Sequence, residues 1–223
     1  METLINADFT ERVVIDTNAL AWVPSPAPGV ERRMLDRIGG EGARATSIVR
    51  YAPDSRFSSH RHDGGEEFLV LDGVFSDSAG DYPAGTYVRN PPGSVHAPWT
   101  HRGCVIFVKL RQMAESESAH VISAPEDRAW QALDARGARR KLLYACPQAR
   151  EVVALEELPS GYEGADDICP RGEELLVLDG TLEDEHGRYA AGTWVRNPAG
   201  FRRRFRSAAG TRYWVKRGHL PPV

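Results

Sequence analysis

The chain has 223 residues, 41% hydrophobic and 26% charged, which is enough to bury two modest cores. Its net charge of −3 argues against general nucleic-acid binding. There is no apolar stretch of membrane-spanning length and no basic-then-apolar leader, so we expect no membrane association. Three cysteines without Cys-x-x-Cys spacing (Cys104, Cys146 and Cys169) predict unpaired thiols and a cytoplasmic protein.

In chain order, the first half is typical of short strands separated by turns. Residues 69–71, 86–88 and 105–108 are rich in β-branched, aromatic and other apolar side chains, and glycine-containing turns follow or separate them. Only residues 34–35 and 126–135 suggest a turn or two of helix. Many short strands with frequent turns predict an all-β fold, either a sandwich or a barrel such as a jelly roll.

Four potential metal ligands occur within this first half. His60 and His62 are two residues apart on a predicted strand, so both side chains project from the same face. Gly64 and Gly65 would let the chain bend and bring Glu66 beside them. His96 follows a turn-rich segment that can present one side chain from a neighbouring strand. Three imidazoles and one carboxylate suit Zn, Fe(II), Mn(II) or Ni(II), and we expect one mononuclear site.

The same pattern recurs about 107 positions later. Residues 66–73 read Glu-Glu-Phe-Leu-Val-Leu-Asp-Gly, and residues 173–180 read Glu-Glu-Leu-Leu-Val-Leu-Asp-Gly. The two copies align without a gap from residue 46 to residue 109, and upstream the offset becomes 108. A period of this length is that of a whole domain. We therefore expect a domain with the metal site at 1–113 and a second, degenerate domain at 114–223.

The second copy has lost most of the ligand set. Asp167, Cys169, Glu173 and Arg203 stand where His60, His62, Glu66 and His96 stand in the first. A guanidinium has no lone pair to offer a metal, so we expect Arg203 to replace the ion by pairing with Glu173 and with Asp167. Two alternatives stay open: Arg203 could lie on a solvated edge, or the acidic residues and Cys169 could form a divergent metal site.

Both halves carry a pattern that resembles the paired signature of the cupins. In the first it reads His60-x-His62-x3-Glu66-x6-Gly73, followed by Gly85-x5-Pro91-x-Gly93-x2-His96. The resemblance covers nearly the whole chain and implies a bicupin, two tandem jelly-roll-like barrels. The wording around these residues is most similar to the cupin domain of ChrR-type anti-sigma factors, in which these four residues would be zinc ligands.

The resemblance to ChrR implies a regulatory or reactive-oxygen-sensing protein with zinc as the expected metal. That family's other half has a His-x3-Cys-x2-Cys signature, which is missing here, so we expect the metal-holding cupin to carry over, whereas binding of a sigma factor stays open. The alternative is a small Fe(II) dioxygenase that cleaves an oxygenated organic molecule, as some similar cupins do. The expected partners are a small molecule or reactive oxygen species, and a regulatory protein or a second copy of the chain is also open.

No catalytic acid or base stands out in the sequence. Tyr51 and His101 are interpreted as structural, and Glu67 has the opposite strand parity from the ligands, so it is expected to face outward. Cys104 is interpreted as a small buried hydrophobic residue. If the site senses oxidants, His60, His62, Cys104 and Trp99 are the first positions to test for oxidation.

Overall fold

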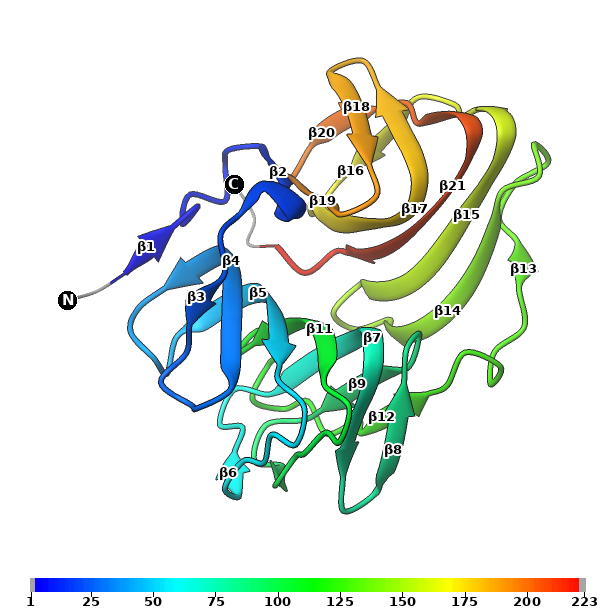
Figure 1. The fold of residues 1–223 in the computed structure, drawn as a ribbon. Helices are drawn as coiled ribbons and strands as arrows, with labels where there is room; N and C mark the ends of the chain where they lie inside the picture. The colour runs from blue at the N-terminus through cyan, green and yellow to red at the C-terminus, as the bar shows by residue number, and fades with distance from the viewer. Residues whose placement is uncertain (1–2, 221–223) are drawn as a thin grey trace. The chain divides into compact units, whose positions relative to one another are not determined.

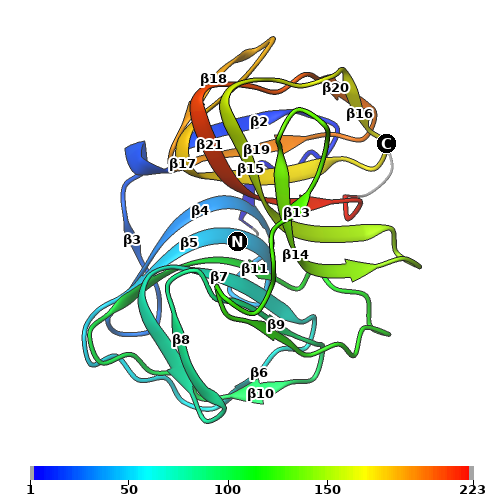
Figure 2. The same ribbon diagram turned by 90° about the vertical axis from the view of Figure 1, so that its right-hand side faces the viewer.

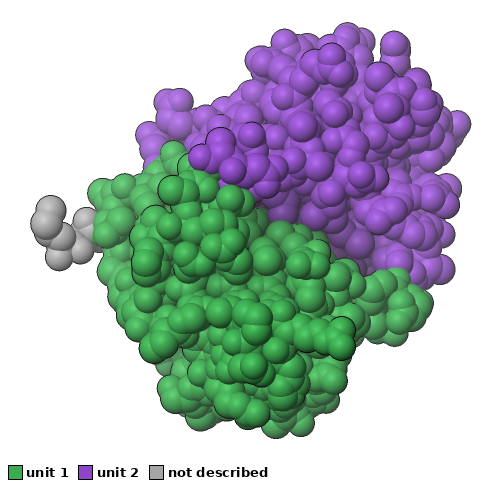
Figure 3. Space-filling view, in the orientation of Figure 1, with its two compact units in different colours: residues 1–7, 20–127 green, residues 8–19, 128–223 purple. Residues whose placement is uncertain are grey.

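A computed structural model describes residues 3–220, which form two compact units (Figures 1 and 3). Unit 1 contains residues 20–127 together with the N-terminal segment up to Ala7. Unit 2 contains Asp8–Ala19 together with the chain from Arg128 onward. The predicted boundary between residues 113 and 114 differs from this division, because each unit takes in a segment that the repeat assigns to the other half.

Unit 1 is built around one antiparallel sheet with the order β1-β4-β5-β11-β7-β9-β12, with β3 paired to β4 and β8 paired to β7. A separate pair, β6 and β10, lies on the side of the unit away from β4 and β5 (Figure 2). The strands are β1 (Leu4–Ile5), β3 (Val23–Pro24), β4 (Val30–Ile38), β5 (Arg44–Tyr51), β6 (His60–Arg61), β7 (Glu66–Asp77), β8 (Gly80–Pro83), β9 (Tyr87–Asn90), β10 (Val95–His96), β11 (Cys104–Leu110) and β12 (Val121–Ser123).

Unit 2 repeats this arrangement with the order β13-β14-β15-β21-β17-β19-β2, with β18 paired to β17, and a separate β16–β20 pair. Its elements are β2 (Val13–Asp16), a short 3₁₀ helix η1 (Thr17–Ala19), β13 (Gln131–Ala132), β14 (Arg139–Cys146), β15 (Glu151–Glu163), β16 (Asp167–Cys169), β17 (Glu173–Asp184), β18 (Gly187–Ala190), β19 (Thr193–Asn197), β20 (Phe201–Arg203) and β21 (Arg206–Arg217).

The predicted all-β class is confirmed, and the predicted strand segments lie in β7, β9 and β11. The suggestion of helical turns was wrong in both places. Residues 34–35 lie inside β4, and the 126–135 segment is loop apart from the two residues of β13. Pairing of β4 along its length with β5 outweighs the weak local helical pattern there. No helix among the described residues is long and apolar enough to cross a membrane.

The two sequence repeats exchange one strand. β2 belongs to the first repeat but pairs with β19 in unit 2, where Trp194 lies opposite Ile15. β12 belongs to the second repeat but pairs with β9 in unit 1, where Val88 lies opposite Ile122. Because β2 and β12 are about 108 positions apart, they are the same element of the repeat. Each repeat therefore contributes this strand to the sheet of the other.

Each unit has its own apolar core inside the curled sheet. In unit 1 the core includes Phe68, Val70, Phe75 and Ile106, and in unit 2 the matching positions are Leu175, Val177, Leu182 and Tyr213. These side chains alternate along β7, β11, β17 and β21 with residues on the other sheet face, as expected for strands with one face inside a barrel. The functional side chains described next line the same interiors.

Candidate metal centre

His60 and His96 lie on two paired strands. β6 and β10 are antiparallel, and their register places His96 directly opposite His60 and Val95 opposite Arg61. Directly opposed residues on antiparallel strands have neighbouring side chains. The prediction that His96 arrives from an adjacent strand is therefore confirmed, and His62 follows just beyond the end of β6.

Two glycine turns hold His62 in place. Its carbonyl accepts hydrogen bonds from the backbone N–H of Gly65 at 3.2 Å and of Gly93 at 2.8 Å, and its own N–H donates to the Ser94 carbonyl at 3.0 Å. Gly65 and Gly93 have φ values of 75° and 87°, in the left-handed region that glycine adopts without a Cβ clash. The bend at Gly65 delivers Glu66 to the start of β7, as the sequence predicts.

The three predicted histidine ligands converge, and Glu66 lies beside two of them. The ligand nitrogens of His60, His62 and His96 all lie within 4.8 Å of one another. The Nε2 atoms of His62 and His96 are 2.9 Å apart, and Glu66 Oε2 lies 3.4 Å from the first and 3.6 Å from the second. Ligand atoms about 2.1 Å from one ion are separated by about 3.0 Å at a right angle and about 3.4 Å at the tetrahedral angle. The spacing of these three atoms thus fits a shared ion.

Hydrogen bonds at the outer nitrogens orient two of the histidines. His96 Nδ1 lies 3.2 Å from Asp77 Oδ2, and His60 Nδ1 lies 3.1 Å from the Ser58 carbonyl. Both acceptors favour the tautomer with hydrogen on Nδ1, which leaves the Nε2 lone pair for a metal. Asp77 is itself fixed by hydrogen bonds from the Tyr82 hydroxyl and the Ala79 N–H, both at 2.8 Å.

The protonation states also suit metal binding. Burial, with a contribution from the charge of His60, lowers the pKa of His62 to about 4. Burial likewise lowers the pKa of His96, although Glu66 opposes the shift. Both rings are therefore neutral near pH 7 and can donate lone pairs.

Glu66 is a buried carboxylate, 6% exposed, whose pKa burial raises. The Asn90 amide donates to its Oε2 at 3.1 Å. No Lys or Arg in the part of the chain that the structure describes forms an ion pair with Glu66. A buried carboxylate without a positive partner is unfavourable, and a bound cation would remove that cost.

The cluster opens into a cavity of about 320 Å³ in unit 1. All four predicted ligands line it. The apolar and aromatic lining residues are Val30, Ala43, Val49, Tyr51, Phe57, Phe75, Pro98, Val108 and Leu110, and the charged ones besides the ligands are Arg32, Glu41, Arg61, Asp63 and Arg111. Cavities of this size that combine apolar walls with polar groups are typical of small-ligand sites. Tyr51 is thus a wall residue, in line with its structural interpretation, whereas His101 is 70% exposed and is not among the lining residues.

In unit 2 Arg203 stands in the place predicted for the missing metal. Its Nε and Nη2 bind the two oxygens of Glu173 at 2.9 and 3.0 Å, and its Nη1 binds Asp167 Oδ2 at 2.9 Å. The Arg203 side chain is only 5% exposed, so the solvated-edge alternative was wrong. Burial would raise the pKa of Glu173, but Arg203 and Arg217 hold it well below its usual range.

Arg217 and Glu156 are parts of this network that sequence reasoning missed. Arg217 Nε binds Glu173 at 3.1 Å, and its two terminal nitrogens bind both oxygens of Glu156 at 2.7 and 2.9 Å. Leu110 and Val49 occupy the matching positions in unit 1, as shown by their pairing opposite Glu66 and Ile106. The sequence did contain a signal for them. Glu156 and Arg217 are charged, whereas the residues 107 positions earlier, Val49 and Leu110, are apolar.

The structure also decides the remaining predicted positions. Cys104 is buried, 3% exposed, and burial raises its pKa to about 12, so its interpretation as a buried hydrophobic residue is confirmed. Cys169 is likewise buried, and burial raises its pKa, with Glu173 adding to the shift. Glu67 was expected to face outward but is 1% exposed, because it accepts hydrogen bonds from Tyr87 and Arg89 on the other sheet face.

Comparisons with known proteins agree with this architecture. A protein from Nostoc punctiforme described as a candidate dioxygenase superposes with a TM-score of 0.78 at 17% identity, covering 96% of this chain and 85% of that one. A candidate glyoxylate-induced protein from Pseudomonas aeruginosa gives a TM-score of 0.73 at 15% identity, covering 92% and 87%. A bacterial pirin from Escherichia coli, in complex with nickel(II), gives 0.67 at 11%, covering 96% and 100%. At these identities the likeness shows the fold alone.

No curated protein matches the chain at a significant level. The family model described as the ChrR Cupin-like domain, however, matches it twice, at residues 10–114 and 118–221. These two matches follow the sequence repeat, and together they cover nearly the whole chain. The structure has one such sheet system in each unit, and the family model matches both halves. The chain therefore belongs to the ChrR cupin-like family and is a bicupin.

Proposed function

We propose that unit 1 holds one divalent metal ion through His60, His62, Glu66 and His96, and that the protein carries out metal-dependent chemistry on a small molecule in the adjoining cavity. The observation that carries the proposal is the Glu66 carboxylate, buried beside three imidazoles and paired with no Lys or Arg of the described chain. The matching Glu173 binds two arginines. The first barrel thus keeps the buried carboxylate, Glu66, but has candidate metal ligands instead of arginines around it.

The donor set suits zinc, Fe(II), Mn(II) or Ni(II), and zinc is the metal we expect from the ChrR resemblance. A divalent ion at this position supplies Lewis acidity, and iron would add redox chemistry with O2. The chain's own residues prepare the site. Asp77 fixes the His96 tautomer, Asn90 holds Glu66, and the apolar walls limit the access of water to a bound molecule.

The cavity favours an enzyme, most simply an Fe(II) dioxygenase acting on a small oxygenated compound. An octahedral metal with only four protein ligands leaves coordination positions for a substrate, and a cavity of about 320 Å³ with apolar and charged walls adjoins it. The likeness to the Nostoc protein described as a candidate dioxygenase supports the same class.

The second candidate is a regulatory or reactive-oxygen-sensing protein that acts through a protein partner. The match of both halves to the ChrR cupin-like family favours it. In this case the oxidisable groups are His60 and His62 rather than Cys104, because the Cys104 thiol is buried and is not among the cavity lining. The three free cysteines are consistent with a reducing cytoplasm for either candidate.

Metal analysis by mass spectrometry on protein purified without added metal tests the site. We expect about one ion per chain in the wild type and an almost complete loss in His62→Ala. Cys169→Ala, which changes the matching position of unit 2, is the control and should retain the full metal content. Equal metal loss in both variants, or a metal-loaded His62→Ala, would contradict the assignment.

O2 uptake then separates the two candidates. The Fe(II)-loaded protein is mixed with acetylacetone, a diketone, or with 4-hydroxyacetophenone, and O2 consumption is followed with an electrode. Uptake that depends on the organic compound and disappears in His62→Ala supports the dioxygenase. Tightly held zinc, no uptake, and oxidation of His60 or His62 by singlet oxygen would instead support the sensor.

A further inference from the structure

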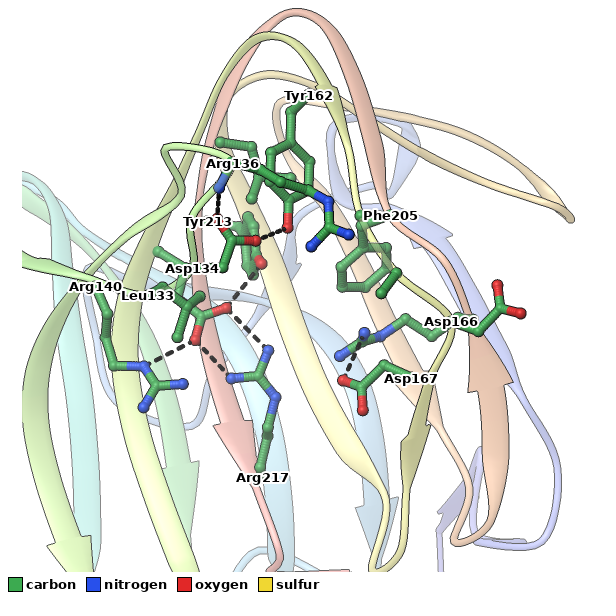
Figure 4. Close-up of a pocket in the computed structure, with 15 residues that line it drawn as sticks. Leu133, Asp134, Arg136, Arg140, Tyr162, Asp166, Asp167, Phe205, Tyr213 and Arg217 are labelled. Carbon is green, nitrogen blue, oxygen red and sulfur yellow. Dashed lines mark hydrogen bonds and ion pairs between the residues drawn. The ribbon is translucent and has the colours of Figure 1, made fainter.

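Unit 2 encloses a second cavity, of about 400 Å³, that is separate from the metal centre (Figure 4). Its lining combines four arginines, four acidic residues, two tyrosines and several apolar side chains. In Figure 4, Arg140 and Arg217 lie in the lower part of the pocket, and Tyr162 and Phe205 lie above them. We propose that this cavity binds a small monocarboxylate with a compact apolar body, which its guanidinium groups recognise through their unused N–H donors.

The two buried carboxylates of this cluster have no capacity left. Glu156 accepts four hydrogen bonds, from Arg140 Nε, from the Tyr213 hydroxyl and from both terminal nitrogens of Arg217. Glu173 also accepts four, from Asn197, from Arg217 and two from Arg203. A carboxylate has about four acceptor positions, so both groups are saturated. A ligand that needs acceptors would find none on them.

The donors, by contrast, are in excess. Each guanidinium carries five N–H donors in a planar fork. Within residues 3–220, Arg203 and Arg217 each use three of their five, and Arg140 uses one, through Nε. These three guanidinium groups therefore retain unused donors, and Arg140 contributes the largest share. An acceptor-rich group is the chemical complement of such a surface.

The formal charges of the lining balance. Arg136, Arg140, Arg203 and Arg217 line the cavity together with Asp134, Glu156, Asp166 and Asp167. Asp166 and Asp167 are 85% and 58% exposed and are therefore largely solvated, and Asp134 accepts the hydrogen bond of the Tyr162 hydroxyl. A carboxylate on the ligand would accept two N–H bonds from one guanidinium.

The upper wall defines the rest of the ligand. Leu133, Leu158 and Phe205 line the cavity with apolar surface, and the Tyr162 ring is tied by its hydroxyl to Asp134 at 2.6 Å. The Tyr162 hydroxyl thus donates its hydrogen bond to Asp134 and has no donor left for a ligand in the cavity. A short branched or aromatic body fits such a wall, because it would bury apolar area without leaving polar atoms unpaired.

Binding can be tested by isothermal titration of the purified full chain with acetate, isobutyrate and benzoate at constant ionic strength. We expect saturable binding, tightest for isobutyrate or benzoate because the apolar body adds contact. Benzamidine, which has nearly the shape of benzoate but carries a positive charge and donors, should not bind. Absence of saturable binding for all three carboxylates up to about 10 mM, or equal binding of benzamidine, would overturn the proposal.

Variants of Arg140 locate the site. Arg140→Met should weaken binding by about tenfold or more, since a charge-assisted hydrogen bond is lost, and Arg140→Lys should recover part of it. Glu156 keeps Arg217 and Tyr213 in these variants, so the fold is retained, which circular dichroism can verify. Arg139→Met is the matched control, because the neighbouring Arg139 is 56% exposed and pairs with Glu157 outside the cavity.

A variant Arg140→Met that binds the carboxylates as the wild type does would reject the assignment of this cavity. The same titrations are repeated on protein treated with a chelator. Unchanged affinity after metal removal would separate this site from the metal centre, whereas loss of binding with the metal would show that the carboxylates occupy unit 1 and would overturn the proposal for unit 2.

Discussion

Glu66 and Glu173 occupy the same position in the two barrels, but they have different partners. Each begins a long strand, lies opposite an asparagine of the next strand, and accepts a hydrogen bond from that asparagine, at 3.1 Å from Asn90 and 2.9 Å from Asn197. In unit 2, Arg203 and Arg217 bind the carboxylate. In unit 1, His96 and Leu110 take their places, so no arginine neutralises Glu66 there, as the proposed metal site requires.

The neighbouring wall changes together with this partner. Val49 and Leu110 line the cavity of unit 1, whereas Glu156 and Arg217 line that of unit 2. An arginine 3.1 Å from the carboxylate would repel a metal ion, and an apolar residue would not. The two barrels therefore differ in more than the four candidate ligand positions: in unit 2 a second guanidinium and a second carboxylate fill the space around the first pair.

Removing the guanidinium of Arg203, which pairs with Glu173, should have the largest effect on stability. Arg203→Met leaves Glu173 buried with Arg217 alone and is expected to destabilise unit 2 by about 3–5 kcal/mol. Urea unfolding, with hydrogen exchange to assign the transition to unit 2, measures the loss. Arg204→Met is the control: its side chain is 47% exposed and pairs only with exposed acids, so a change below about 0.5 kcal/mol is expected. Equal effects of the two variants would contradict a buried pair.

Acid should weaken unit 2 through Glu156. Burial would raise its pKa, but Arg217 and the hydrogen bonds outweigh burial and lower it to about 2. A depressed pKa gives stability that is complete above the unfolded value near 4.5 and is lost as the pH falls towards 2. We expect a loss on the order of 3 kcal/mol over that window. Urea unfolding at pH 5, 4 and 3 measures it, and Glu156→Gln should make the profile less steep, leaving the share of Glu173, whose pKa is also lowered. A wild-type profile as flat as that of the variant would contradict the assignment.

The outer hydrogen bond to His96 gives a smaller effect on metal binding. Asp77→Asn removes the charge that orients the ring, and we expect the metal affinity to fall by about 10- to 100-fold. Competition with a chromogenic chelator measures the affinity. Asp184 is the matching residue of unit 2, and Asp184→Asn should leave the metal affinity unchanged. If the two variants behave alike, Asp77 does not act through His96.

A variant next to the exchanged strand β2 should have the smallest effect on stability, and the effect should be confined to unit 2. Arg12 precedes β2 and binds Asn197, Asp184 and Tyr189 of unit 2, each at 2.8 Å. Arg12→Ala should destabilise unit 2 by about 1–2 kcal/mol and leave unit 1 unchanged, because the chain around residue 12 belongs to unit 2. Hydrogen exchange resolved by unit measures both. Glu11→Ala, an exposed neighbour, is the control, and a loss confined to unit 1 would contradict the strand exchange.

Much of the site could be predicted because its spacing is local. The two-residue step from His60 to His62, the glycine bend before Glu66 and the turn before His96 each constrain a few neighbouring residues. The pair between Arg203 and Glu173 followed from the repeat, because equivalent positions in two copies of a fold share a location. The prediction that Glu67 faces outward was wrong, because strand parity gives the sheet face of a side chain but not whether that face is covered.

The duplication, the all-β class, the four candidate ligands of the first barrel and the Arg203–Glu173 pair of the second could be predicted from spacing and repetition along the chain. The exchange of β2 and β12, the partnership of Arg217 with Glu156, and the two cavities became apparent only in the folded molecule. The reason is physical. Residue spacing fixes which side chains are neighbours along one strand, whereas the partner of a strand edge and the space left inside a barrel depend on the packing of distant segments.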